Sequence, residues 1–390
     1  MNNKKLPLKQ TLAALTLAAT SIGFASSTAA SLNYNNSGLD SVNKNKALKS
    51  GHEYMIVANY PNQLNVLDLK SDSVYKTCQM PDRFGPGALQ VSPDKKTAYI
   101  LNNGYEDIYG VDMDTCDVTF HARMAQAPKE RTKTLYAFTL SYDGKELYAV
   151  QNPTLLERDH YRVQPTRLAV YDTSSGLNAK PIRTLPSPRL VTAMQTGKDG
   201  GLYMAGADIY KMDVNTGEYS VAVPSRNWQR PRYVQPDVLN VWAVQTPTQD
   251  FTILYTTARF QEGSEDLNTA DWLYGYFNIN LETGKTETKD FGPITEIYFT
   301  GMRSPKDPNL VYGVLNRLAK YDVKQQKLIK AAALDHSYYC IAMNHDGSKV
   351  YLGGTFDDVA IYNADSLEKL GNIKLPGGDM AISTSQVFIR

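Results

Sequence analysis

The chain has 390 residues, of which 42 % are hydrophobic and 21 % charged, with 41 Lys and Arg against 40 Asp and Glu. This is an ordinary globular composition, which excludes a disordered chain. The balanced charge lacks the basic excess expected of a protein that binds nucleic acid or anionic membranes. Tyrosine is unusually frequent, with 26 residues, and aromatic residues favour β-strands.

Residues 1–30 have the layout of a secretory signal peptide. Three lysines precede an apolar run at 11–25, and small residues at 27–30 offer a cleavage site. The run is too short to span a bilayer, and the alternative is a buried N-terminal helix. Cleavage would leave 38 basic and 40 acidic side chains. We therefore expect export to a bacterial periplasm, followed by a flexible leader at 31–50, for which a partner-binding arm is the alternative.

From Tyr54 onward, short strand-like runs recur between two kinds of tight turn. The first turn has the pattern apolar-apolar-x-Asp or Asn, followed by a polar pair. It occurs seven times, at Asp68, Asp112, Asp172, Asp213, Asn280, Asp322 and Asn363. The second lies between these and occurs six times, at Asp94, Asp143, Asp199, Asp250, Asp307 and Asp346. Repeats of this length, with four short strands each, are typical of β-propeller blades.

The first turn occurs seven times and the second only six times. This difference indicates that one blade is split between the two ends of the chain. Residues 54–80 would supply three of its strands and residues 380–389 the innermost one, so that the ring closes without an open edge. The sequence therefore predicts an all-β, seven-bladed propeller over residues 51–390, closed by the C-terminal strand and the N-terminal strands.

The three cysteines fall at informative places in this alignment of blades. Small residues stand six positions before the second turn's Asp, at Ala88, Ala137, Ala193, Gly301 and Cys340. Innermost strands are crowded, so we expect Cys340 to be a packing residue rather than a nucleophile. Cys78 and Cys116 lie in neighbouring blades, and export permits a disulfide. Because sequence alone does not bring their Cα atoms within bonding range, this pairing stays open.

The strand order of a blade sends both tight turns to one face, the turn face, and the longer connections to the other, the loop face. The longest connections are 80–87, 125–134, 152–167, 224–237, 258–272 and 334–339. Long loops on a rigid scaffold commonly carry binding sites. They hold side chains that are aromatic, Arg or His, several of them of types enriched at protein interfaces: Trp228, Arg230, Arg232, Tyr233, His336, Tyr338 and Tyr339. Tyr338 and Tyr339 could equally begin a strand and pack between blades.

No sequence motif for catalysis is present. The chain contains no C-x-x-C-H haem attachment, H-E-x-x-H, G-x-S-x-G, P-loop or dinucleotide fingerprint. His160 and His336 share the loop face, which leaves a two-histidine metal site as an alternative, but we predict no metal. Asp237 and Asp335 are the acids that merit consideration for chemistry, and we predict no catalytic residue in this chain.

Three strings of the sequence resemble a known family. HYRVQPTRLAVYD (160–172), YVQPDVLNVW (233–242) and HSYYCIAMNHDGSKVYLGG (336–354) are similar to the β subunit of quinohaemoprotein amine dehydrogenase. The likeness runs in blade order from about Tyr54 to Ile389. The propeller pattern is shared with methylamine dehydrogenase heavy chains and lactonase-like propellers, whereas the three strings lie outside what the blade repeat dictates.

The resemblance implies a periplasmic heterotrimer that oxidatively deaminates primary amines to aldehydes. In that family a large α subunit is a dihaem cytochrome with haem c, and a small γ subunit carries a cysteine tryptophylquinone. The propeller subunit has no cofactor of its own. It cradles the small quinone-bearing subunit and helps to enclose the amine pocket. The membrane and nucleic acids are not among the implied partners.

The resemblance also implies which residues would line the pocket or the subunit interface. The matching positions with the strongest expectation are Gln164, Arg167, Trp228, Tyr233, Asp237, His336, Tyr338 and Tyr339. Other matches are His160, Pro165, Thr166, Gln235, Pro236 and Ser337. The chain departs from the family at Asp335, where proline is usual, in the acidic loop 258–272, and in its three cysteines.

Two other functions remain as alternatives to a dehydrogenase subunit. One is a stand-alone lactonase-like hydrolase that works near the propeller axis. The other is a periplasmic binding or sensor module.

Overall fold

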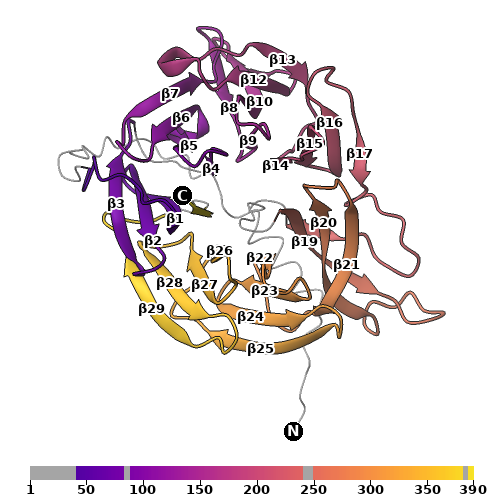
Figure 1. Ribbon diagram of the computed structural model, residues 1–390. Helices are drawn as coiled ribbons and strands as arrows, with labels where there is room; N and C mark the ends of the chain where they lie inside the picture. The colour runs from indigo at the N-terminus through magenta and orange to yellow at the C-terminus, as the bar shows by residue number, and fades with distance from the viewer. Residues whose placement is uncertain (1–40, 83–87, 240–248, 381–384) are drawn as a thin grey trace.

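The computed structural model describes residues 41–82, 88–239, 249–380 and 385–390. Its strands form seven antiparallel sheets arranged in a ring (Figure 1). The predicted seven-bladed β-propeller is therefore confirmed. The predicted signal peptide and the leader up to residue 40 lie outside the described residues. In the described part of the chain, no helix has the length and apolar character that a membrane span requires.

Each blade runs from an innermost strand at the axis to an outermost strand at the rim. Blade 1 has β4 (Leu89–Val91), β5 (Thr97–Asn102), β6 (Asp107–Asp112) and β7 (Val118–Arg123). Blade 2 has β9 (Phe138–Leu140), β10 (Glu146–Leu156), β12 (Arg167–Asp172) and β13 (Arg183–Pro186). Two further strands, β8 (Glu130–Lys133) and β11 (Tyr161–Val163), pair with β10. Blade 3 has β14 (Ala193–Thr196), β15 (Gly201–Ala205), β16 (Ile209–Asp213) and β17 (Tyr219–Val223). Two short 3₁₀ helices, η1 (Asn103–Tyr105) and η2 (Gly176–Asn178), lie in connections.

The remaining blades follow the same order. Blade 4 has β18 (Asp237–Leu239), β19 (Asp250–Arg259), β20 (Asp271–Asn280) and β21 (Thr286–Pro293). Blade 5 has β22 (Thr300–Arg303), β23 (Leu310–Val314), β24 (Arg317–Asp322) and β25 (Lys327–Ala333), and blade 6 has β26 (Cys340–Met343), β27 (Lys349–Gly353), β28 (Asp358–Asn363) and β29 (Lys369–Lys374). Blade 7 combines β1 (Glu53–Asn59), β2 (Gln63–Asp68) and β3 (Ser73–Gln79) with the C-terminal β30 (Ser385–Ile389).

Blade 7 closes the ring in the predicted way. Strand β30 pairs antiparallel with β1, with Phe388 opposite Tyr54. Pairing of the two ends of the chain satisfies the backbone groups that an incomplete blade would leave open.

Part of the tyrosine excess lies in the second strand of the blades. Tyrosines at 99, 148, 203, 255, 312 and 351 all lie in second strands and are buried. A tyrosine offers a large apolar ring to fill the space between blades and a hydroxyl that reaches a polar partner. Tyr312 shows this in its hydrogen bond to the carbonyl of Ala364, and Tyr351 in its bond to Asp72.

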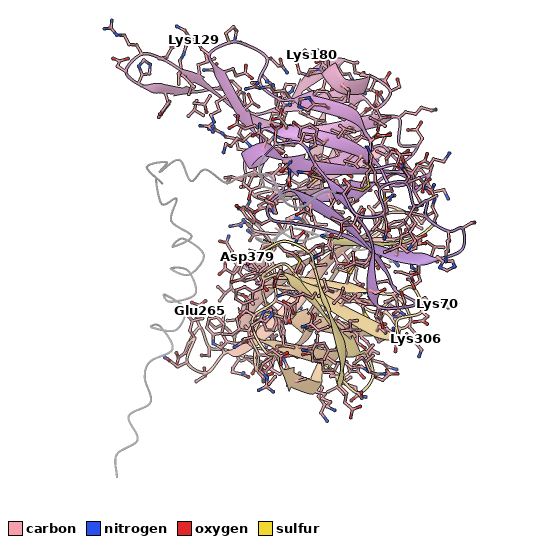
Figure 2. The ribbon with its side chains drawn as sticks, turned by 90° about the vertical axis from the view of Figure 1, so that its left-hand side faces the viewer. Lys70, Lys129, Lys180, Glu265, Lys306 and Asp379 are labelled. Carbon is pink, nitrogen blue, oxygen red and sulfur yellow. A yellow bond between two sulfur atoms is a disulfide. The ribbon has the colours of Figure 1, made fainter. Side chains whose placement is uncertain are left out.

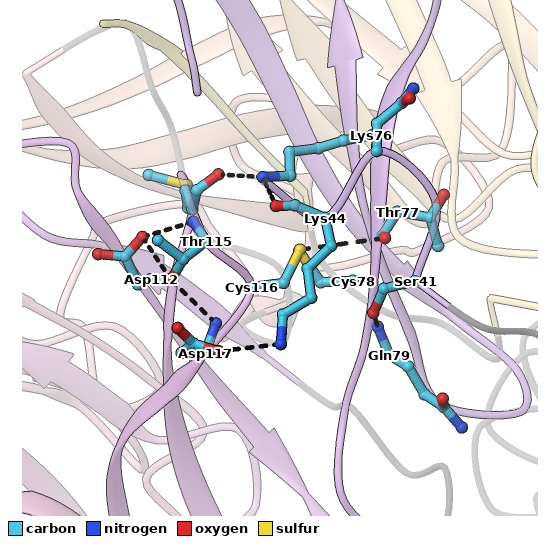
Figure 3. The surroundings of a disulfide bond; sticks show 12 residues. Ser41, Lys44, Lys76, Thr77, Cys78, Gln79, Asp112, Thr115, Cys116 and Asp117 are labelled. Carbon is cyan, nitrogen blue, oxygen red and sulfur yellow. Dashed lines mark hydrogen bonds and ion pairs between the residues drawn. A yellow bond between two sulfur atoms is a disulfide. The ribbon is translucent and has the colours of Figure 1, made fainter. Parts of the chain in front are cut away.

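A disulfide joins Cys78 of β3 to Cys116 in the turn between β6 and β7, with Cα atoms 5.2 Å apart (Figure 3). The pairing that the sequence left open is thus present, and it connects blade 7 to blade 1. Cys340 is buried at the axial end of blade 6, in agreement with its expected packing role. Burial raises the pKa of the Cys340 thiol to about 12, which keeps it protonated and unreactive at neutral pH.

Residues 41–50 are not a free leader, in contrast to the flexible segment that their polar composition predicts. Val42 pairs with Thr77 of β3, and Leu48 is buried. The ammonium of Lys76 donates to the carbonyl oxygens of Lys44 and Lys46. Polar residues are ordered here because a buried cation gathers their backbone carbonyls, a contact that composition does not reveal.

The two faces of the ring differ as the sequence predicts. Lys129, Glu265 and Asp379, all in long connections, lie on one side of the molecule, whereas Lys70 and Lys306, in tight turns, lie on the other (Figure 2). The loop face therefore gathers the long connections that fall within the described residues.

Candidate functional site

The predicted site residues lie on the loop-face side of three different blades. The structure places them in a cluster beside blade 4, a cluster with a pocket beside blade 6, and an arm that extends from blade 2. It does not bring all of them into one constellation.

The blade 4 cluster is organised around the buried carboxylate of Asp290. Arg230 binds both of its oxygens, at 2.8 and 2.7 Å. The hydroxyls of Tyr233 and Tyr255 donate to the same carboxylate, at 2.9 and 2.7 Å. The guanidinium of Arg230 also lies 3.6 Å from the centre of the Tyr233 ring. Burial alone would raise the pKa of Asp290, but the hydrogen bonds from Arg230 and the two tyrosines outweigh it and lower that pKa below its usual value.

Trp228 belongs to the interior of the same cluster. Its ring packs edge-on against Tyr233, Tyr255 and Phe277, and its indole nitrogen donates to the carbonyl of Val234 at 3.1 Å. Trp228 is buried, so it holds the connection 224–237 against blade 4 rather than offering its ring to solvent. Asp237, at the start of β18, is exposed and stands outside the hydrogen-bond network around Asp290.

The blade 6 cluster pairs His336 and Tyr338 with Asp358, the first residue of β28. His336 Nε2 lies 3.0 Å from one carboxylate oxygen, and the Tyr338 hydroxyl donates to the other at 2.8 Å. His336 Nδ1 lies 2.9 Å from the carbonyl of Ser337. The Thr355 hydroxyl lies 3.4 Å from the same Nδ1, so each ring nitrogen of His336 has a polar partner. Tyr338 is completely buried, and burial and the bond to Asp358 raise the pKa of its hydroxyl.

A pocket of about 520 Å³ opens beside this cluster on the loop face. Its walls include His336, Tyr339, Phe356 and Asp379. The rings of His336 and Phe356 meet edge to face with centroids 4.8 Å apart. The pocket thus combines two aromatic walls with an exposed carboxylate at Asp379, whose side of the molecule Figure 2 shows.

The arm is the largest departure from the blade pattern. Strand β10 continues beyond blade 2, and its outer half pairs with β8 on one side and β11 on the other. The sequence was interpreted as loop at 125–134 and 152–167, but the two segments form a three-stranded sheet with the end of β10. Arg167 anchors its base, donating to Glu130 at 2.6 Å and to Gln151 at 2.9 Å. Gln164 is half-buried and donates to the carbonyl of Arg162.

The arm presents apolar side chains to solvent. Tyr161 and Val163 alternate with Arg162 along β11, and they are 77 % and 62 % exposed. Leu156, at the end of β10, is also exposed. Residues two apart on a strand share a face, so Tyr161 and Val163 form one apolar edge. Exposed apolar side chains in a group mark sites of interaction more often than single ones do.

The candidate metal and acid groups have separate partners. His160 lies beside Asp159 on the arm at 2.8 Å, whereas His336 is bound to Asp358 in blade 6. Asp335 pairs with Lys369. Across residues 41–82, 88–239, 249–380 and 385–390, no three or more His, Cys, Asp or Glu side chains are grouped so as to hold a metal ion.

The sequence interpretation missed two carboxylates that organise these clusters, Asp290 and Asp358. A signal for Asp358 does exist, because the third strand opens on Asp followed by Ile or Val in three blades. Asp107 and Asp358 begin β6 and β28, and Asp208 directly precedes β16. All three are buried and bind groups outside their own strand: His121, His336 and the backbone amide of Asn227, respectively. Asp290 lies within β21 and has no comparable pattern.

Comparisons with known proteins bear on the fold. No protein-family model and no curated protein sequence matches the chain. Among solved structures, apo AztD from Citrobacter koseri is similar with a TM-score of 0.50 at 10 % identity, over 86 % of this chain and 98 % of that one. Kuenenia stuttgartiensis hydrazine synthase is similar with a TM-score of 0.48 at 14 % identity, over 81 % and 90 % of the two chains. The dihydro-haem d1 dehydrogenase NirN is similar with a TM-score of 0.48 at 14 % identity, over 88 % of this chain and 76 % of that one. At 10 % identity, the likeness to AztD is one of fold alone.

Proposed function

We propose that this chain is a non-catalytic, partner-binding propeller subunit. More specifically, it would be the cofactor-free propeller subunit of a periplasmic quinohaemoprotein amine dehydrogenase, which deaminates primary amines oxidatively to aldehydes. A small quinone-bearing subunit would dock on the loop face, and a dihaem cytochrome subunit would complete the complex. The observation that carries the proposal is the sheet-built arm of blade 2, with Tyr161 and Val163 held out into solvent.

The placement of the resembling strings supports this choice of face. The string 160–172 supplies β11 of the arm and its return into blade 2, and the string 336–354 supplies His336 and Tyr339 of the loop-face pocket. An arm fixed by strand pairing and by the Arg167–Glu130 ion pair loses little conformational freedom on binding, which favours affinity.

The residues of this chain would shape the amine site rather than react. The quinone of the small subunit would supply the electrophilic carbonyl. Phe356 and Tyr339 would exclude water from the space above the pocket, and a dry site strengthens the electrostatic interactions within it. Asp379 and His336 would present polar groups at its rim.

Purification of the tagged chain from its native periplasm tests the proposal. We expect a haem Soret band and two additional subunits, one of them stained by a quinone redox reagent. A colourless single chain would overturn the amine-dehydrogenase assignment.

A pair of double variants tests the docking arm separately. Tyr161→Ser with Val163→Ser should release the partners, since exposed aromatic anchors carry much of an interface's energy. Tyr219 and Val221 of β17 offer a matched control, because they are also exposed and two residues apart, on the rim of blade 3. Release by both double variants, or by neither, would show that the arm is not the docking site.

The pocket beside His336 and Asp358 favours a stand-alone hydrolase as the second candidate. A histidine paired with a carboxylate at an open pocket can act as a general base, although here both ring nitrogens already have partners. This alternative predicts lactone hydrolysis by the isolated chain that is lost in His336→Gln. If the chain neither hydrolysed lactones nor copurified with other subunits, a binding or sensor module would remain as its function.

A further inference from the structure

The turn face carries a pocket where the central axis reaches the surface. It encloses about 320 Å³, and its walls come from blades 7, 1, 2, 3 and 4. Figure 1 shows the innermost strands β4, β9 and β14 around the axis. The volume is at the lower end of the range of small-molecule sites.

Neutral hydrogen-bonding side chains line the inner wall of this axial pocket. Gln90, Thr139 and Gln195 occupy the same position in three successive blades, since each lies directly opposite a tyrosine of the second strand. Gln386 of β30 adds another amide, and its oxygen accepts from the backbone amide of Val91 at 2.6 Å. The Gln386 nitrogen donates to Gln90 Oε1 at 3.4 Å, and an amide carries further donor and acceptor sites that a polar ligand atom can use.

Lys95 adds a positive charge at the mouth of the pocket, in the turn between β4 and β5. Within the described ranges, no carboxylate lies within ion-pair distance of its ammonium, and burial lowers its pKa, an effect that the charge of Asp94 only partly offsets. The other acid at the wall, Asp250, is already paired with Arg303 at 3.2 Å. The described residues thus give the Lys95 ammonium no ion-pair partner. An anionic ligand would compensate for the free-energy cost of its desolvation.

Apolar side chains also line the pocket. They are Val91, Pro93, Leu140, Leu281 and Phe388. A strongly hydrated inorganic anion gains nothing from such surface, whereas an organic anion would bury a hydrocarbon chain against it.

We propose that the axial pocket of the turn face binds a small organic monoanion, a carboxylate with a short apolar chain. The carboxylate lies against Lys95 and the amides of Gln90 and Gln195, and the chain lies against the apolar wall. This inference is independent of the proposed function, because the pocket opens on the face opposite the docking arm.

Titration of the purified full chain with butyrate in low-salt buffer tests the proposal by calorimetry. We expect saturable binding with a Kd below about 1 mM, which is within ordinary ligand efficiency for a molecule of this size. Butyramide and butylammonium, which have the same chain length without the negative charge, should not compete. Absence of binding at tens of millimolar butyrate, or equal binding of butyramide, would overturn the proposal.

Substitution of two adjacent lysines locates the site. Lys95→Gln should weaken butyrate binding about tenfold or more, since a hydrogen bond to a charged group is lost. Lys96→Gln, in the same turn but exposed, should leave the affinity unchanged. Gln195→Leu keeps the charge and removes an amide from a different blade, and it should also weaken binding. Equal affinity in Lys95→Gln and wild type, with unchanged thermal midpoints, would show that the anion binds elsewhere.

Discussion

The ammonium of Lys76 is buried completely and donates to the carbonyl oxygen of Asp114 at 2.8 Å, across the junction between blade 7 and blade 1. The same nitrogen reaches the carbonyls of Met113, Lys44 and Lys46. Asp114 in turn accepts from the backbone amide of Leu48 and pairs with the C-terminal Arg390. One turn of blade 1 therefore holds the N-terminal strap, residues 41–50, and the end of the chain. Figure 3 shows Lys44 of this strap, which is bonded to Lys76 and to Asp117.

Replacement of Lys76 by Met should destabilise the closure of the ring. The variant keeps the volume but leaves the carbonyl oxygens without their shared donor, at a cost of about 2–3 kcal/mol. Urea unfolding measures the loss, and limited proteolysis within residues 41–50 should become faster. Lys70→Met, at an exposed position in the β2–β3 turn, is the control. Equal stability of the two variants would contradict a structural role for the buried ammonium.

The Cys78–Cys116 disulfide should contribute measurably to stability. The cysteines are 38 residues apart, and closing a loop of this length restricts the unfolded chain by about 4 kcal/mol in the chain-entropy model. Dithiothreitol should lower the urea midpoint of the wild type but not that of Cys78→Ala with Cys116→Ala. Cys340→Ala should retain the response, because alanine occupies the matching position in three other blades. If dithiothreitol left the urea midpoint of the wild type unchanged, the disulfide would make no such contribution.

Loss of Arg230 should leave the Asp290 carboxylate buried with only phenol donors. We expect Arg230→Met to lower the free energy of unfolding by about 3 kcal/mol at neutral pH. Because the pKa of Asp290 in the folded wild type is lowered, its contribution is present above the unfolded pKa and disappears as pH falls through the folded value. The difference between variant and wild type should thus shrink in acid. Arg226→Met, exposed on the same connection, should show no such difference.

Glu146 provides a second test of acid sensitivity. Two hydrogen bonds from Arg183, at 2.7 and 2.8 Å, lower the pKa of Glu146 despite its partial burial. Its contribution should be complete above its unfolded pKa, near 4.3, and lost below the folded value. Glu146→Gln should cost about 1 kcal/mol at pH 6 and less at pH 3, as read from urea midpoints. The exposed Glu262→Gln should cost nothing at either pH.

Trp228 should affect partner binding only by stabilising the fold of this chain. Its ring is buried against Tyr233 and Tyr255, so Trp228→Ala should lower stability by about 3–5 kcal/mol. Phe356→Ala, which removes an exposed ring from the same face, should leave stability nearly unchanged. If Trp228→Ala abolished partner binding at full thermal stability, the ring would have to make a direct contact.

Much of the architecture could be predicted from the sequence because it depends on local chemistry. An Asp or Asn in a tight turn caps its own backbone, as Asp112 does by accepting from the amides of Asp114 and Thr115. Such turns repeat at a regular spacing, so they establish the number of blades and the two faces without knowledge of distant contacts. The split of blade 7 follows from the same count.

The parts that the sequence left open depend on residues that meet only after the ring closes. Asp290 and Arg230 are separated by 60 residues, and no local pattern relates them. The arm was interpreted as loops because each of its strands is short, and it becomes a sheet only where β8 and β11 reach the extended β10. The strap 41–50 is polar and is held by contacts with β3 and with the β6–β7 turn of blade 1, among them the bonds from the Lys76 ammonium. Local turn chemistry thus determined the fold of this protein, whereas only tertiary structure decided which charges are buried, because burial depends on what the other blades bring near.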